Sequence, residues 1–404
     1  MVKKKEEKNI IWDFVEKHTN LVYFIIITVL ALIVRMLLIE YCSGDYDMFL
    51  KPWFEELKSY GGLGGLAHDI GNYTPGYMTI LALLTYLPIK SVISIKIVSF
   101  IFDFIGAFAA LKITRELLSE KKYKDKIALL VYGICLFIPT VLLNSAYWAQ
   151  SDGIYTAFVL LSIYFLIKNS FKKAIIFWSI ALSFKFQAIF IFPLFVLMYI
   201  ADHKNIKFRY FLFIPLIVFI FSIPKVIYSH DLLAGFKVYI NQAGTYTQYI
   251  TLNFPNVYSI FLKGYDVNNP NLINTPFKEL STIGIIVTFI ILVTLAYFVY
   301  TKKIKFDKKA IIEFGLLSIL LTTFFLPQMH ERYLFMGDII GILYLVMNRK
   351  NYYVPLMIEF ISLNGYMYLL FGGFAINFST LSIAFLVLIV LYTRNICHDY
   401  FDFD

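Results

Sequence analysis

Long, unbroken apolar segments recur along most of this 404-residue chain, and they restrict its fold more than any other feature. A helix needs about 20 apolar residues to cross a bilayer core about 30 Å thick. Because lipid offers the backbone no hydrogen-bond partners, only helices and closed barrels can span it. The segments are continuous rather than alternating, and only 16% of all residues are charged. The sequence therefore predicts an all-α, polytopic transmembrane helical bundle.

We predict about twelve spans in one transmembrane domain, 1–404. They are 21–41, 92–113, 126–146, 151–168, 174–184, 188–201, 209–228, 281–301, 310–326, 333–347, 351–370 and 374–393. The apolar segment 76–89 is brief, and Pro75 and Pro88 lie near its ends, so we expect an interfacial helix that does not cross.

Positively charged residues predict the orientation. With the N-terminus inside, most Lys and Arg residues fall on the cytoplasmic side, as is usual for short loops. A thirteenth span at 76–89 would turn the Lys-rich loops 114–125 and 302–309 outward. We therefore expect a multi-pass plasma-membrane protein with cytoplasmic termini and two long, ordered outer loops, 42–91 and 229–280. The net charge of +9 is then a topology signal, and we expect no nucleic-acid partner.

Polar outliers gather on the predicted outer face. Asp45 and Asp47 follow the first span, where a carboxylate could act as a general base. The alternative is a solvated loop start or a helix cap. Further along, Asn72 and Tyr73 belong to a turn that leads into the interfacial helix, and they could also line a site.

Three more polar clusters follow. Trp148 suits an interfacial anchor, but the neighbouring Gln150 and Asp152 are more polar than an anchor requires. Lys185 and Gln187 interrupt an apolar stretch, where a lysine either snorkels to the interface or lines a site. A short outer loop carries His330, Glu331 and Arg332, which is either a charged hairpin or an anion-binding group. Arg35, Asp103, Asp338 and Glu359 lie within predicted spans, and the sequence leaves their pairing open.

Six segments in register resemble the GT-C polytopic glycosyltransferases, which use polyprenyl-phosphate sugars. They are GDYDMFLKPW at 44–53, NYTPGY at 72–77, IFDF at 101–104, NSAYWAQSD at 144–152, FKFQAIFIFPLF at 184–195 and MHERY at 329–333. Within that class, the chain is similar to bacterial GPI-mannosyltransferase-like proteins. It more distantly resembles eukaryotic glucosyltransferases that use dolichyl-phosphate glucose.

The resemblance implies roles for the matching residues. The family's catalytic acid matches Asp45, and a second acid matches Asp47. The Lys-x-Gln segment matches Lys185 and Gln187, and the His-Glu-basic triplet matches the segment from His330 to Arg332. The glucosyltransferases have a polar, His-rich stretch where this chain has the segment 147–150, so glucose is not carried over as the donor sugar.

The sequence thus predicts an inverting transfer of a hexose from a polyprenyl-phosphate sugar to a lipid-linked or polymeric glycan acceptor on the outer face, in cell-envelope assembly. Asp45 or Asp47 would be the base. The donor phosphate would be bound by Lys185, His330 and Arg332. Substrate would also contact Asn72, Tyr73, Trp148, Gln150, Asp152, Gln187 and Glu331. We expect no required cofactor and no metal site, although two nearby carboxylates could hold Mg²⁺ or Mn²⁺. The alternative functions are a transporter or lipid-linked oligosaccharide flippase, or a structural partner in polysaccharide assembly.

Overall fold

The computed structural model describes residues 17–244, 249–261, 277–373 and 376–401, and these are mostly helical. Helices of ten or more residues are α2 (Thr19–Leu37), α4 (Pro75–Leu84), α5 (Ser91–Leu117), α6 (Lys124–Phe137), α8 (Asp152–Ile167), α9 (Phe171–Phe184), α10 (Phe192–Ala201), α11 (Phe213–Ser229), α12 (Ala234–Gly244), α14 (Phe277–Thr301), α15 (Lys308–Phe325), α16 (Phe335–Met347), α17 (Tyr353–Phe371) and α18 (Phe378–Tyr400).

Shorter elements connect them. These are α3 (Lys51–Ser59), α7 (Pro139–Leu142), α13 (Val257–Phe261), the π-helical η1 (Tyr46–Leu50) and η3 (Leu143–Tyr147), and the 3₁₀ segments η2 (Gly62–Ala67), η4 (Phe186–Ile191), η5 (Phe208–Leu212) and η6 (Arg349–Asn351). Strands β1 (Thr251–Leu252) and β2 (Met329–His330) pair in parallel, with Thr251 opposite Met329.

Among the described residues, six helices are long and apolar enough to cross a membrane. They are Thr19–Leu37, Ser91–Leu117, Phe208–Ser229, Glu279–Thr301, Arg349–Phe371 and Phe378–Tyr400. The pair α6 and α7–η3 adds a seventh if its 48° bend lies within one span. These helices support an all-α, multi-pass membrane protein. The count of twelve stays a prediction, because helices such as α8, α9 and α16 are shorter than the about 20 residues that a span needs.

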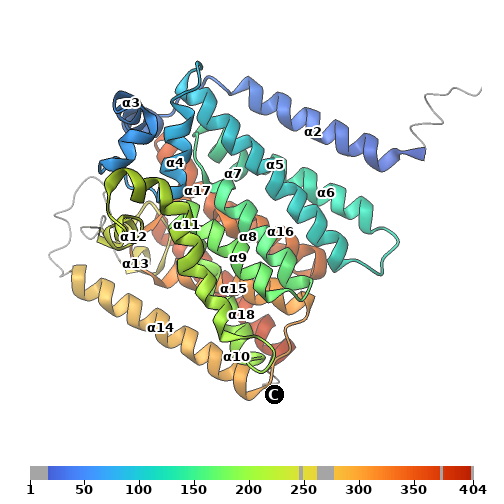
Figure 1. Cartoon of the computed structure of the whole chain (residues 1–404). Helices are drawn as coiled ribbons and strands as arrows, with labels where there is room; N and C mark the ends of the chain where they lie inside the picture. The colour runs from blue at the N-terminus through green and yellow to red at the C-terminus, as the bar shows by residue number, and fades with distance from the viewer. Residues whose placement is uncertain (1–16, 245–248, 262–276, 374–375, 402–404) are drawn as a thin grey trace, which may run out of the picture.

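Burial separates a central helix from a lipid-facing rim. Every residue from Ala310 to Phe324 in α15 is buried, and α15 contacts α10, α14, α16 and α18. In contrast, only 11% of the apolar window of α2 and 17% of that of α14 are buried. These two helices lie along opposite edges of the molecule (Figure 1). Their exposed Leu, Ile and Phe side chains form the apolar exterior that a bilayer requires.

The short helices of the two long predicted loops gather at one end of the bundle, where α3, α4, α12 and α13 lie (Figure 1). α4 has ten residues, so its length of about 15 Å is half of the bilayer core. α4 contacts α9 and α11, and α11 contacts α12, so both loops pack on α11. The segments 1–16, 245–248, 262–276, 374–375 and 402–404, which include part of the second predicted loop and the start of the last predicted span, lie outside the described residues.

Arg35 of α2 and Asp103 of α5 form a buried ion pair. Both Nε and Nη2 of Arg35 donate to Asp103 Oδ2, at 3.1 and 2.9 Å. The Ser145 hydroxyl donates to the same oxygen at 2.5 Å, and neither charged side chain is more than 1% exposed. Arg35 and Asp103 therefore neutralise each other between neighbouring helices.

Asp338 and Glu359, which also lie in predicted spans, take hydroxyl partners. Asp338 of α16 accepts a hydrogen bond from Ser362 at 2.9 Å. Glu359 of α17 accepts the amide and the hydroxyl of Thr140, at 3.1 and 2.8 Å. No lysine or arginine of the described residues forms an ion pair with either carboxyl group. These contacts join α16 and α17 to each other and to α7.

Gly76 allows α4 to approach α9 closely. A Cβ atom at position 76 would lie 2.5 Å from the backbone carbonyl oxygen of Ser183, which cannot easily move. Gly76→Ala is therefore expected to lower the free energy of unfolding by about 1–3 kcal/mol, measured as a lower thermal midpoint in detergent. The control is Gly64→Ala, because a Cβ there meets no atom within 4 Å. Equal destabilisation by both substitutions would contradict this close packing.

Candidate functional site

The candidate site is built around Asp45, which immediately precedes η1. Its Oδ2 atom accepts hydrogen bonds from Trp148 Nε1 at 2.9 Å and from Gln150 Nε2 at 2.7 Å. The Tyr73 hydroxyl donates to Gln150 Oε1 at 3.0 Å. No side chain or backbone group of the described residues donates to Oδ1 of Asp45. One carboxylate oxygen is thus fixed by two donors, while the other is open to a substrate.

The backbone around Trp148 and Gln150 is shaped for this contact. The π-helical segment η3 ends at Tyr147, and Ala149 then adopts φ 67°, in the left-handed region that non-glycine residues rarely occupy. The Ser99 hydroxyl fixes the turn by donating to the Gln150 carbonyl at 2.8 Å. Such strain persists where the surrounding structure holds it, often at functional sites. Here it brings two donors from neighbouring positions onto one carboxylate.

A buried group of charges lies next to this network. Lys185 Nζ is 2.6 Å from Oδ1 of Asp152, the first residue of α8. Arg332 Nε lies 3.5 Å from Asp152 Oδ2, and Arg332 Nη1 donates to Glu331 Oε1 at 2.6 Å. Asn144 also donates to Asp152 Oδ2, at 2.8 Å. Asp152 therefore holds two cations from different parts of the chain, because Lys185 joins α9 to η4 and Arg332 follows β2.

Aromatic rings connect the carboxylate to the cations. The Arg332 guanidinium carbon lies 5.2 Å from the centre of the Trp148 ring, whose N–H group binds Asp45. Lys185 Nζ lies 5.2 Å from the centre of the Tyr73 ring. Cation–π contacts of this kind favour the charged form and hold the rings in place. These contacts form one continuous cluster of side chains. Its members are Asp45, Tyr73, Trp148, Gln150, Asp152, Lys185, Glu331 and Arg332.

The charges in the cluster affect one another's pKa values. Burial lowers the pKa of Lys185 to about 8, although Asp152 opposes the shift. Burial also disfavours the charged form of Glu331, but Arg332 and His330 outweigh it and lower the pKa of Glu331. Burial acts against the charge of Arg332 too, yet Tyr73, Glu331 and the nearby aspartates raise its pKa well above the ordinary value. At neutral pH both cations and Glu331 are charged.

Asp47 is not part of the cluster. It is exposed, and it forms an i,i+4 ion pair with Lys51 at 3.3 Å. The two acids of the first loop therefore have different partners, which makes Asp45 the better candidate for a base. Within the described ranges, no group of three or more His, Cys, Asp and Glu side chains could hold a metal ion.

Three further predicted residues have different positions. His330 lies at the edge of the cluster, with Nδ1 at 3.7 Å from Glu331 Oε2. Asn72 lines a separate cavity, and its backbone carbonyl accepts a hydrogen bond from Gln242. Gln187 lies in η4, and no hydrogen bond from the part of the chain that is described joins it to Lys185 or Asp152.

Asn144 and Tyr366 complete the site but were not predicted. Asn144 Nδ2 donates to the Tyr366 hydroxyl at 2.9 Å as well as to Asp152. The Tyr366 ring meets the Trp148 ring edge to face, with centres 5.3 Å apart. Asn144 opens the polar segment 144–152, so its position in the sequence was a usable signal. Tyr366 lies in the apolar helix α17, where nothing in the sequence marks it.

No family model matches the chain, and no curated protein matches it. The chemistry is therefore inferred from the site itself. A fixed carboxylate with an open oxygen can accept a proton from a bound hydroxyl group. Two buried cations beside it can stabilise negative charge that develops on a leaving group. Together these features fit a transfer reaction in which a hydroxyl group displaces an anion.

Proposed function

We propose that this chain is an inverting hexosyltransferase that uses a polyprenyl-phosphate sugar and a glycan acceptor at the outer membrane face. One observation carries the proposal: aromatic side chains join the carboxylate of Asp45 to two cations. Trp148 donates to Asp45 and packs on Arg332. Tyr73 donates to Gln150, which binds Asp45, and packs on Lys185. Asp45 takes the proton of the acceptor hydroxyl, whose oxygen bonds to the anomeric carbon. The bond from that carbon to the phosphate oxygen breaks, and the phosphate leaves as an anion beside the cations.

The ion pairs of Lys185 and Arg332 do not use all of their N–H donors, so some remain for a phosphate group. Lys185 and Arg332 are balanced by Asp152 and Glu331, so the cations remain stable when no substrate is bound. Arg332 Nε faces Asp152 at 3.5 Å and Nη1 donates to Glu331, whereas Nη2 makes no hydrogen bond with the described residues. A guanidinium group has five N–H donors in a planar fork that fits phosphate oxygens. An incoming phosphate can therefore bind Arg332 without first breaking its contact with Glu331.

The test is sugar transfer by the purified protein in phosphatidylcholine nanodiscs. Synthetic polyprenyl-phosphate mannose, glucose and galactose serve as donors, and extracted envelope glycolipids serve as acceptors. The product is expected to gain one hexose by mass spectrometry and to have the inverted anomeric configuration by NMR. A transporter or flippase would move a lipid-linked sugar without forming a bond. Retention of configuration would contradict a single displacement, and no transfer from any donor would contradict the enzyme.

The lowered pKa of Lys185 predicts that donor binding weakens at alkaline pH. Its pKa is lowered to about 8, so it is protonated at pH 7 and loses its positive charge as the pH rises through 8. The KM for the donor is expected to rise about tenfold for each pH unit above that point. In Lys185→Arg the guanidinium stays charged, and the rise should disappear below pH 10. A donor KM with the same alkaline rise in both proteins would assign the titration to another group.

A further inference from the structure

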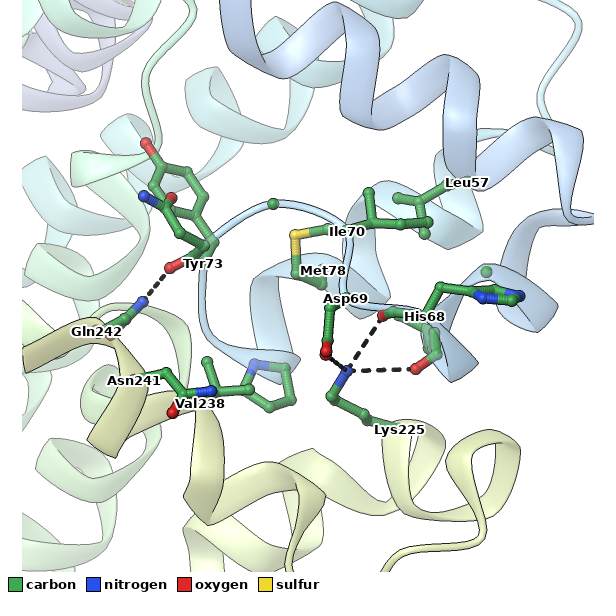
Figure 2. Close-up of a pocket in the computed structure, with 15 residues that line it drawn as sticks. Leu57, His68, Asp69, Ile70, Tyr73, Met78, Lys225, Val238, Asn241 and Gln242 are labelled. Carbon is green, nitrogen blue, oxygen red and sulfur yellow. Dashed lines mark hydrogen bonds and ion pairs between the residues drawn. The ribbon is translucent and has the colours of Figure 1, made fainter. Parts of the chain in front are cut away.

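A cavity of about 210 Å³ lies beside the candidate site, where η2 and the start of α4 meet α11 and α12 (Figure 2). This is below the about 300–1,000 Å³ of pockets that enclose drug-sized molecules. One small chemical group therefore suits it better than a long chain. The lining comes from both long predicted loops, because Asn72 lies in the first and Gln242 in the second.

The lining has little net charge to offer a ligand. Its lysine, Lys225, reaches from α11 to the carbonyl oxygens of Leu66 and His68, at 3.4 and 3.3 Å. Lys225 Nζ also lies 3.7 Å from Asp69 Oδ1 (Figure 2). The lysine and the aspartate thus offset each other. Among the described lining residues, Lys225 already faces two carbonyl oxygens and a carboxylate, so an uncharged ligand suits the cavity better than a phosphate or carboxylate group.

Side-chain amides supply its polar surface. Gln242 donates its amide N–H to the backbone carbonyl of Asn72. This hydrogen bond is the dashed line that begins at Gln242 in Figure 2. Its amide oxygen, Oε1, is buried and accepts no hydrogen bond from the described part of the chain. A buried acceptor without a partner is unfavourable, and a ligand hydroxyl group would satisfy it. Amides both donate and accept, as hydroxyl groups do. The chemistry that fits is a ring bearing several hydroxyl groups.

Tyr73 connects this cavity to the candidate base. Its side chain lines the cavity, and its hydroxyl points away from Gln242 (Figure 2) and donates to Gln150 at 3.0 Å. Gln150 in turn donates to Asp45. We propose that the cavity binds a neutral sugar ring of the glycan acceptor. Sugar binding rests on the cavity alone, and the assignment of that sugar to the acceptor rests on the proposed function.

The experiment measures binding of methyl mannoside, methyl glucoside and methyl galactoside by saturation-transfer NMR, with the protein in phosphatidylcholine nanodiscs free of sugar detergents. At least one methyl hexoside is expected to bind. Gln242→Leu should weaken it about five- to tenfold, the value of one hydrogen bond. Val238→Phe, which fills the cavity from α12, should abolish binding. Asn205→Leu, in an exposed loop outside the cavity, is the control and should leave binding unchanged.

Binding that is absent in the wild type, or unchanged in both cavity variants, would overturn the inference, as would binding of inorganic phosphate at the cavity. The thermal midpoint of each variant separates loss of binding from loss of folding. The two proposals can fail separately. Cavity-dependent sugar binding without transfer from any donor would reject the enzyme and keep the sugar site. Transfer with an acceptor KM that Gln242→Leu does not change would keep the enzyme and reject the acceptor role.

Discussion

Asp45→Asn is expected to lower the rate of sugar transfer by about 10²–10⁴-fold, the usual contribution of a general base. Asparagine keeps the shape of the side chain, and its amide oxygen can still accept the hydrogen bonds from Trp148 and Gln150. It cannot take a proton from an acceptor hydroxyl at the position of Oδ1. The loss should therefore appear in kcat, with little change in the KM for the donor or in the thermal midpoint.

Asp47→Asn is the matched control, because it makes the same chemical change two residues away. Asp47 is exposed and bound only to Lys51 among the described residues, so its loss should leave the transfer rate within about twofold of wild type. If Asp47→Asn is the inactive variant and Asp45→Asn transfers sugar normally, the base assignment is wrong. A large loss in both variants would instead indicate that the two acids act together.

Arg35→Met is expected to lower the free energy of unfolding by about 3–5 kcal/mol, because it leaves the Asp103 carboxyl group buried without its cation. Both partners are almost fully buried, so water cannot replace the lost contact. The readout is the thermal midpoint in detergent. The double variant Arg35→Met/Asp103→Leu should recover most of the loss, because an apolar pair of similar volume removes the unpaired charge.

Lys90→Gln is the control for this pair. Lys90 and Glu40 also lie close, at 2.8 Å, but their side chains are 67% and 63% exposed. Solvent screens such a pair, so the midpoint should stay near that of the wild type. A double variant no more stable than Arg35→Met alone would show that α2 and α5 depend on the ion pair itself rather than on the neutrality of their contact.

Local hydropathy predicted the helices well, because an apolar run of about 20 residues has few other folds in lipid. Hydropathy alone does not decide which of these helices cross the membrane. α8 and α16 are shorter than a bilayer core and mostly buried among other helices. A helix enclosed by protein need not match the thickness of the lipid, so its sequence does not reveal whether it spans. Whether such a helix crosses the membrane depends on the positions of the helices packed around it.

The candidate site was predictable in its residue types but not in its contacts. Polar residues in an apolar chain pointed to Asp45, Asp152, Lys185 and Arg332 because such residues are expensive to place in lipid. The choice between Asp45 and Asp47 depends on which side of a π-helical turn faces Trp148, and that is a property of packing. Asn144 belongs to the polar segment 144–152 and could have been noticed, whereas Tyr366 lies in an apolar helix. The side-chain amide of Asn144 donates both to Asp152 and to the Tyr366 hydroxyl, and so links Tyr366 to the site.

The ion pair between Asp152 and Lys185 also bears on how the chain enters the membrane. The two residues are 33 positions apart and lie at the same end of the α8–α9 hairpin. Each charge alone would oppose insertion by about 2.5–3.5 kcal/mol. Paired at 2.6 Å, the two charges offset each other at this end of the hairpin, which lowers that cost wherever the end lies in lipid. Both residues precede Arg332 in the chain, so this part of the site can form within one helical hairpin, without the residues that follow it.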